Sequence, residues 1–348
     1  MKANILFAFI IAYIVTFVLT PFVKKLAFKI GAVDVPRDNR RMHKRPTARL
    51  GGLAIYFGFM ISAFLFCEID KQLAGIMIGA TIIVILGVFD DIYALSAKLK
   101  FAVQFGAALF PCIMGVQVEF IRVPQFISPS GYIGLGLLAI PVTMIWIVGI
   151  SNAVNLLDGL DGLACGVSSI SALTLLSIAL IAGEPAVAFV TSALVGACFG
   201  FLPYNFNPAK LFMGDTGALF LGFMLAATSV QGLFKGYAVI SNAAPFVSLG
   251  LRIFDTLSAI IRRIKNGRPI MSPDREHLHH RLVDAGFSQK QAVTIIYILC
   301  SILCHSAVAQ IATGAVSLWV FIVVLVAMSA FLYLAPIILE WISEKEDK

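Results

Sequence analysis

Charged residues are scarce in this sequence, and their scarcity excludes an ordinary soluble domain. Asp, Glu, Lys and Arg make up 13% of the 348 residues, whereas hydrophobic residues make up 59%. A typical soluble domain carries about 25% charged residues. The chain is therefore predicted to be an integral membrane protein.

Other common features are also missing. The six cysteines include no C-x-x-C pair, so they predict thiols packed in the core. There is no fixed-period repeat, low-complexity tract or soluble domain, which predicts one membrane domain over residues 1–348. The apolar runs lack the alternation of barrel strands, which leaves helices as the spanning elements. The first run has no small-residue cleavage site and is predicted to be a retained span.

Eleven apolar stretches have the length that a helix needs to cross a hydrocarbon core of about 30 Å. They run approximately over Asn4–Phe22, Leu50–Cys67, Leu73–Phe89, Phe101–Val118, Ile133–Ile150, Leu163–Ala182, Ala186–Leu202, Leu211–Val230, Tyr237–Ile261, Ala292–Ala312 and Val316–Leu339. The predicted fold class is all-α, a polytopic transmembrane helix bundle of about eleven spans.

The positive charges predict the orientation of these helices. If the N-terminus is outside, 21 of the 26 lysines and arginines fall in the odd-numbered loops and the C-terminal tail, four fall outside, and Arg252 lies within a span. Because lysine and arginine accumulate on the cytoplasmic side, we expect an outside N-terminus and a cytoplasmic C-terminus. The dense polar motifs lie on that same side. They predict a site that works on one leaflet, and argue against a conduction path.

Two adjacent carboxylates end the third stretch. Asp90 and Asp91 follow seventeen apolar residues, and Lys98 and Lys100 come soon after them. Paired acids at the water boundary can bind a divalent cation or accept a proton, and lysines can hold phosphate. A polar helix end is the plain alternative, but so abrupt a pair of acids favours a functional role.

The segment S-N-A-V-N-L-L-D-G-L-D-G-L follows the fifth stretch and is the most specific motif in the chain. Asn152, Asn155 and Asp158 recur every three residues, so on a helical turn they share one face. Glycines on either side of Asp161 allow a ligand to approach the backbone, or a sharp turn. Loop amides and turn glycines without a ligand are the alternative.

A third motif, Y-N-F-N-P-A-K-L-F-M-G-D-T-G, surrounds the start of the eighth stretch. It places Asn205, Asn207 and Asp215 near Phe212. An acid framed by two glycines suits a hard cation that also binds water and substrate phosphate. The aromatic ring can stack on a base, although a ring packed against lipid or core is equally compatible with the sequence.

A fourth motif, S-P-D-R-E-H-L-H-H-R-L, holds His277, His279 and His280 between Arg275 and Arg281. Zinc ligation is conceivable, but no cysteine or suitably spaced acid joins the histidines. The arginines make a clamp for anionic phosphate the favoured interpretation. The first loop adds R-R-M-H-K-R-P-T-A-R-L-G-G, whose cations are either topology markers or phosphate ligands.

These four motifs, in this order and on this side of the membrane, resemble those of the polyprenyl-phosphate N-acetylhexosamine-1-phosphate transferases, glycosyltransferase family 4. The match runs from Arg45 to Phe287, together with the pattern of spans. The resemblance implies transfer of a sugar 1-phosphate from a UDP-sugar to a polyprenyl-phosphate lipid. It also implies Mg²⁺ as the cofactor, with Mn²⁺ as the alternative.

Motifs and resemblance together predict the site. In the family, acids matching Asp90 and Asp91 lie at the catalytic centre, the acid matching Asp215 binds Mg²⁺, and the aromatic matching Phe212 packs near uracil. The predicted catalytic residues are Asp90, Asp91, Asp158, His279 and His280; the predicted substrate-binding residues are Lys98, Lys100, Asn152, Asn155, Asp161, Asn205, Phe212, Arg275, His277 and Arg281; the predicted metal ligand is Asp215.

The histidine motif also indicates a branch of the family. Muramoyl-pentapeptide transferases carry three consecutive histidines, whereas this chain has H-L-H-H. That difference favours the N-acetylglucosamine branch, which initiates teichoic acid or O-antigen, and argues against a pentapeptide substrate. Undecaprenyl phosphate is the expected acceptor.

The implied reaction joins two anionic substrates, so catalysis must neutralise charge and align the reacting groups. We favour direct attack by the lipid phosphate, which is mostly deprotonated at pH 7 because its second pKa is about 6. The expected location is the plasma membrane, with the site facing the cytoplasm. Expected partners are the two substrates and membrane lipids, with no nucleic acid and with a homodimer possible.

Two other classes of protein share some of these sequence features. A secondary transporter would use Arg252 and Asp255 within the ninth span, but transporters place polar groups at mid-depth in both halves. Alcohol phosphotransferases that use CDP-lipids share D-G spacing, yet D-G-L-D-G-L lacks the following A-R and the later paired acids. Both alternatives explain fewer of the motifs.

Overall fold

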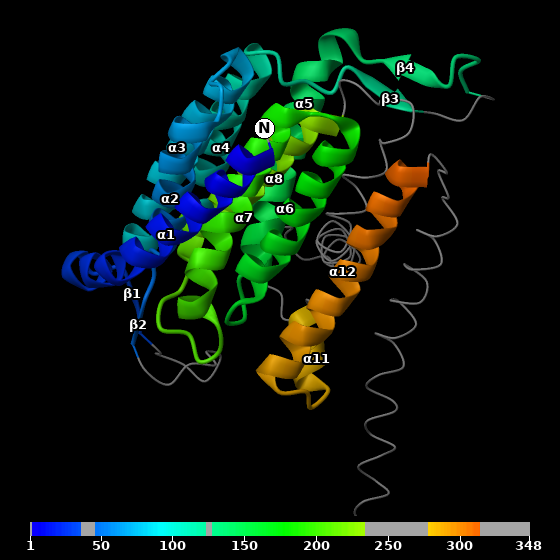
Figure 1. Ribbon diagram of the computed structural model, residues 1–348. Coiled ribbons are helices and arrows are strands. Elements are labelled where there is room, and N and C mark those ends of the chain that lie inside the picture. Colours follow the sequence, from blue (N-terminus) through cyan, green and yellow to red (C-terminus); the bar gives the residue numbers. More distant parts are fainter. Residues whose placement is uncertain (1, 36–45, 123–126, 234–277, 314–348) are drawn as a thin grey trace, which may run out of the picture.

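The computed structural model describes residues 2–35, 46–122, 127–233 and 278–313, and most of them are helical (Figure 1). The helices are α1 (Lys2–Ile30), α2 (Gly52–Phe66), α3 (Lys71–Tyr93), α4 (Ala97–Ile113), α5 (Ala139–Leu157), α6 (Leu163–Ala182), α7 (Pro185–Asn205), α8 (Gly214–Leu233), α11 (Leu278–Asp284) and α12 (Gln289–Thr313), with a short 3₁₀ turn at Gly136–Leu138. The strands are β1 (Val33–Asp34), β2 (Thr47–Ala48), β3 (Phe120–Arg122) and β4 (Tyr132–Gly134).

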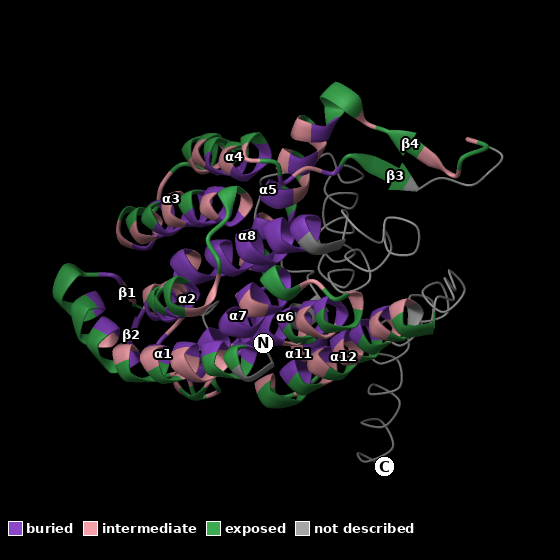
Figure 2. Cartoon of the chain, turned by 45° about the horizontal axis from the view of Figure 1, so that its top comes forward, coloured by how far each residue is buried: buried purple, intermediate pink, exposed green. Residues whose placement is uncertain are grey.

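Helix α8 lies at the centre of the bundle and is buried along almost its whole length (Figure 2). It packs against α3 and α5, while α7 packs against α1, α2 and α6, and α12 packs against α6. The outer faces expose large apolar side chains, such as Leu6, Phe7 and Phe22 on α1. An apolar exterior around an apolar core suits a bundle whose surroundings are lipid.

Each predicted apolar stretch that the structure describes is helical over most of its length, although Ile133–Ile150 begins in strand β4 and Phe101–Val118 extends beyond the end of α4. Six of these helices are long and apolar enough to cross a membrane. Helices α2 and α4 are shorter, with 15 and 17 residues. The stretches Tyr237–Ile261 and Val316–Leu339 lie outside the described residues. The helical, multi-pass character of the chain is therefore confirmed, while the eleven spans and the orientation of the termini stay predictions.

The loops contain structure that the apolar pattern did not predict. Two short antiparallel pairs form, β1 with β2 and β3 with β4. Helix α1 also continues past Phe22 to Ile30 and includes Lys24, Lys25 and Lys29. Lysines near a helix C-terminus interact favourably with its dipole, so the end of an apolar stretch need not be the end of the helix.

Small residues allow three helices to meet at one point. A Cβ on Gly52 of α2 would come within 2.1 Å of the Gly217 backbone, and one on Gly87 of α3 within 2.3 Å of Thr216. The first turn of α8 can therefore lie directly against both helices. This close crossing places the start of α8 beside the end of α3.

Candidate active site

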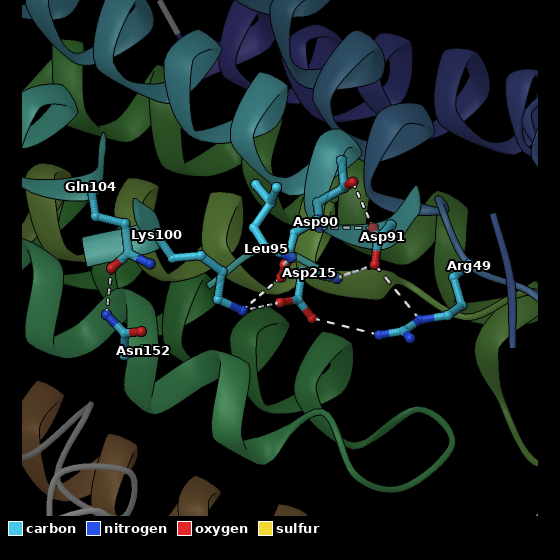
Figure 3. Close-up of polar contacts among 9 residues, drawn as sticks. Arg49, Asp90, Asp91, Leu95, Lys100, Gln104, Asn152 and Asp215 are labelled. Carbon is cyan, nitrogen blue, oxygen red and sulfur yellow. Dashed lines mark hydrogen bonds and ion pairs between the residues drawn. The ribbon is translucent and has the colours of Figure 1, made fainter. Parts of the chain in front are cut away.

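Three carboxylates and two cations gather at one end of the bundle (Figure 3). Asp90 and Asp91 come from the C-terminal end of α3, and Asp215 comes from the first turn of α8. Lys100 extends from the first turn of α4, and Arg49 from the segment that precedes α2. The structure thus brings together the first and third sequence motifs.

Lys100 joins two of the acids. Its Nζ lies 2.6 Å from Asp90 Oδ2 and 2.8 Å from Asp215 Oδ2. Both are charge-assisted hydrogen bonds, which are shorter and stronger than neutral ones. Lys98, two positions earlier on α4, is exposed. Because residues two apart on a helix point about 200° apart, only one of the two predicted lysines faces the carboxylates.

Asp91 acts as a cap for α8. Its carboxylate accepts hydrogen bonds from Asp215 N at 2.9 Å, from Thr216 N at 3.1 Å and from Thr216 Oγ1 at 2.7 Å. The side chain is 0% exposed. A carboxylate at a helix N-terminus satisfies unpaired N–H groups and interacts favourably with the helix dipole. A Cβ on Gly214, where φ is +71°, would come within 2.4 Å of this carboxylate.

Asp90 has different surroundings from its neighbour. Its Oδ1 accepts a hydrogen bond from Leu95 N at 2.7 Å, which closes the turn between α3 and α4. Its Oδ2 accepts a hydrogen bond from the Lys100 ammonium. Asp91 therefore holds the start of α8, whereas Asp90 binds the ammonium group of Lys100.

Arg49 completes the cluster, although in the sequence it is only one of several cations in the first loop. Its guanidinium lies 3.7 Å from Asp91 Oδ1 and 3.7 Å from Asp215 Oδ1. A backbone bridge between Arg49 and Phe212 fixes its place, with Phe212 N donating to Ala48 O at 2.9 Å. The signal in the sequence was the G-G pair after Arg49, because Gly52 makes the close approach to α8 possible.

The second motif lies at the end of α5. The helix ends at Leu157, and Asp158 follows as its C-terminal cap residue. Burial and the negative charge of Asp215 raise the pKa of Asp158 to about 7, and Arg49 partly opposes that rise. Asn155 and Asp158 are half-buried at this end of the bundle. Asn152 donates to Gln104 Oε1 on α4 and, at 2.8 Å, to Val148 O.

Asp161 joins two loops rather than facing the carboxylate cluster. Its Oδ2 accepts hydrogen bonds from Asn207 Nδ2 at 3.0 Å and from Ala209 N at 2.9 Å. Asn207 also donates to Gln289 Oε1 at the start of α12, at 2.6 Å. Tyr297 of α12 donates from its hydroxyl to Gly162 O. Helix α12 thus holds both loops that border the site.

The remaining predicted residues are placed as follows. Asn205 is buried, and its Nδ2 donates to Leu211 O at 3.1 Å, inside the loop before α8. Phe212 is half-buried beside Arg49. His279, His280 and Arg281 belong to α11, where Arg281 is exposed. Arg275 and His277 lie outside the described residues. The clamp predicted for this histidine motif stays a prediction.

The carboxylates are compatible with a magnesium ion. Within the described residues, no group of three or more histidine, cysteine or acidic side chains has the arrangement of a metal site. Mg²⁺, however, commonly takes only one or two carboxylates and completes its shell with water and substrate phosphate. Asp90 and Asp215 already share one cationic group, the Lys100 ammonium. Carboxylate oxygens that already surround the positive charge of Lys100 are of the type that binds Mg²⁺.

An apolar helix bundle with an acid–base cluster at one end defines a multi-pass membrane protein with a polar site at a helix boundary. Comparison with known proteins identifies the family. Residues 73–233 match the model of Glycosyl transferase family 4. A "Probable undecaprenyl-phosphate N-acetylglucosaminyl 1-phosphate transferase" of Bacillus subtilis is 41% identical over 93% of this chain and 90% of its own length. This chain belongs to glycosyl transferase family 4.

Two further relatives extend the comparison. A "Decaprenyl-phosphate N-acetylglucosaminephosphotransferase" of Mycolicibacterium smegmatis is 35% identical over 86% of this chain and 80% of its own length. An "Undecaprenyl-phosphate alpha-N-acetylglucosaminyl 1-phosphate transferase" of Escherichia coli is 26% identical over 90% of this chain and 85% of its own length. The resemblance inferred from the motifs is confirmed, and the transporter and alcohol-phosphotransferase alternatives lose their support.

Proposed function

We propose that this protein transfers N-acetylglucosamine 1-phosphate from UDP-N-acetylglucosamine to undecaprenyl phosphate and releases UMP. The observation that carries the proposal is the cluster of Lys100, Asp90, Asp215 and Arg49 at the end of an apolar bundle. A lipid acceptor needs the apolar surroundings, and two anionic substrates need the cations. The names of the relatives support the same reaction.

The reaction is a direct displacement at phosphorus. An oxygen of the lipid phosphate attacks the β-phosphorus of the UDP-sugar, and the bond from that phosphorus to the bridging oxygen breaks. UMP leaves with the bonding electron pair. Lys100 and Arg49 are placed to neutralise the negative charge on the phosphates. Asp90, beside Lys100, is placed to accept a proton from an acceptor that arrives as the monoanion.

Asp215 is the proposed magnesium ligand, with Asp90 beside it. When bound there, Mg²⁺ would supply a positive charge for the diphosphate oxygens. In the described structure, Lys100 bridges the two carboxylates. We expect its ammonium to exchange one carboxylate for a substrate phosphate when both substrates are bound.

The finer assignments follow from the sequence motifs. The H-L-H-H pattern supports the N-acetylglucosamine branch and a product that initiates teichoic acid or a related envelope polysaccharide. The charge distribution supports a plasma-membrane enzyme whose site faces the cytoplasm. Phe212 and the end of α5 are the proposed neighbours of the uridine.

One assay tests the function. Purified protein with Mg²⁺ and undecaprenyl phosphate is given UDP-N-acetylglucosamine, UDP-N-acetylgalactosamine, UDP-glucose or UDP-N-acetylmuramoyl-pentapeptide, and UMP release is measured. We expect lipid-dependent UMP release with UDP-N-acetylglucosamine as the best donor. Preference for the pentapeptide donor, or no lipid-dependent UMP from any donor, would overturn the proposal.

A further inference from the structure

Gln104 is a polar side chain of α4 that lies deep beside the site. It is one helical turn after Lys100, so the two residues share a face of the helix (Figure 3). Gln104 is only 1% exposed. Buried polar groups at membrane depth are costly, and they need hydrogen-bond partners.

The orientation of the Gln104 amide is set by its neighbours. Asn152 Nδ2 donates to the carbonyl oxygen of Val148, and this hydrogen bond identifies which end of the Asn152 amide is the nitrogen. The same nitrogen then donates its second hydrogen to Gln104, so Gln104 must present its Oε1 to Asn152. Gln104 Nε2 therefore points away from Asn152.

Gln104 Nε2 is a buried donor with no hydrogen-bond partner among the residues that the structure describes. In Figure 3 it points toward the side on which Lys100 lies. Native proteins leave few buried donors unpaired, so each one calls for an explanation. An acceptor group supplied by a ligand would provide the missing partner.

The depth of Gln104 indicates which ligand this is. Four residues along α4 correspond to about 6 Å, so Gln104 lies that much further from the N-terminal end of the helix than Lys100 does. A nucleotide is soluble in water and approaches from the end of the bundle, whereas the chain of a lipid phosphate lies along the apolar flank. The phosphate of a lipid acceptor is therefore the substrate group that we expect on the side of Gln104.

We propose that Gln104 Nε2 donates a hydrogen bond to the phosphate of the polyprenyl-phosphate acceptor and, with Lys100, positions it for attack. This inference rests on the proposed function. It makes Gln104 a specificity residue for the acceptor, while Asn152 orients Gln104 instead of donating to a substrate itself.

The matched change is Gln104→Glu. It retains an acceptor oxygen for Asn152 but replaces the donor with an oxygen that repels phosphate. We expect KM for undecaprenyl phosphate to rise about tenfold to a hundredfold, the range of one hydrogen bond to a charged group, with KM for the UDP-sugar unchanged. Gln104→Leu, which lacks the repulsion, should show a smaller rise in the same constant. The control is Gln72→Glu, the same substitution at the start of α3, whereas Asp90 and Asp91 lie at the end of that helix. This variant should keep both KM values.

Binding of a short-chain prenyl phosphate, compared with the corresponding prenyl alcohol, separates this inference from the proposed function. The parent protein should prefer the phosphate, and Gln104→Glu should lose most of that preference, even if no sugar is transferred. If Gln104→Glu fails to fold, Gln104→Leu decides by the same measurements. Unchanged acceptor KM and phosphate preference in a folded variant would overturn the inference. A rise confined to KM for the UDP-sugar would overturn it too, because the donor diphosphate would then be the ligand.

Discussion

Asp90 and Asp91 are neighbours in the chain, but they differ in what they contact. Asp91 caps α8 through three hydrogen bonds, whereas Asp90 binds Lys100 and closes a turn. A residue 100° further around the helix reaches a different neighbour. The expected roles of the two acids therefore differ, although their chemistry is the same.

We predict that Asp90→Asn lowers activity about 100-fold at pH 6 and recovers part of it as pH rises. Above the second pKa of a phosphate monoester, about 6, the acceptor needs no base. Asp91→Asn should instead lower the melting temperature, because an amide places N–H donors against the N–H groups of α8. Rate against pH and thermal unfolding distinguish the two variants. Equal effects on stability and on the pH profile would contradict this division of roles.

Asp215→Asn tests the metal site. An amide is a poor substitute for a carboxylate on a hard cation, so turnover should fall by at least about 100-fold, and the remaining activity should need more Mg²⁺. The measurement is UMP release during a Mg²⁺ titration after treatment with chelator. Near-normal turnover with an unchanged Mg²⁺ requirement would remove Asp215 from the metal site.

The raised pKa of Asp158 predicts a pH-dependent stability. The folded protein holds the Asp158 proton up to about pH 7, whereas an ordinary aspartate loses it near 3.8. Stability therefore falls as pH rises between these values, by on the order of a few kcal/mol at most. Asp158→Asn should not lose stability in this way, because an asparagine side chain does not ionise. In buffer without Mg²⁺, its melting temperature relative to the parent should be higher at pH 8 than at pH 5. The same difference at both pH values would show that Asp158 ionises normally.

At the scale of elements, helix ends and loops build the site, and helices distant in the sequence hold them. The N-terminal turn of α8 is held by α3 through Asp91, and the loop after α5 is held by α12 through Tyr297. A Cβ on Gly166 would overlap the Tyr297 ring, so α6 and α12 meet closely at this point. Contacts between distant helices therefore hold the start of α8 and the loop after α5 in place.

Tyr297→Phe tests the attachment of α12 to the loop. The ring stays, but the hydrogen bond to Gly162 O is lost, which should cost about 1 kcal/mol of stability. Because Asp158 and Asp161 lie in that loop, we expect KM for the UDP-sugar to rise about threefold to tenfold. Tyr56→Phe is the matched control, since its hydroxyl pairs with Thr81 between α2 and α3. A parental KM in Tyr297→Phe would show that α12 does not position the loop.

At the scale of the whole molecule, an apolar exterior surrounds the polar cluster of Arg49, Lys100 and the three carboxylates, where we propose that both substrates meet. Asp91, the more buried of the paired acids, is fully engaged in hydrogen bonds that hold α8. It is therefore poorly placed to act as a nucleophile. This arrangement favours a single displacement between two bound substrates.

A single displacement has a kinetic consequence. Enzyme given UDP-sugar and Mg²⁺ without lipid should release no UMP above the background of hydrolysis, because no acceptor is present to attack. Rapid-quench measurement of UMP at enzyme concentrations near that of the donor tests this directly. A burst of up to one equivalent of UMP would establish a covalent intermediate and refute direct attack.

Much of the fold could be predicted from the sequence, because the signals are local. Each described span is a continuous apolar run, and a lipid environment leaves helices as the available structure. The motif acids Asp90 and Asp215 also stood out locally, since carboxylates beside apolar runs are rare. The family followed from the order and spacing of the motifs, and the relatives confirm it.

By itself, the sequence determined the helical membrane fold, the family and the candidate acids, because these depend on residues near one another in the chain. Only the tertiary structure decided which charges meet. Lys100 and Asp215 are 115 positions apart, and Asp91 and Thr216 are 125 apart. The pairing of Arg49 with the carboxylates and of Gln104 with Asn152 depends on how the helices pack. Close crossings at Gly52 and Gly87 set that packing, and no local pattern specifies which helices will cross.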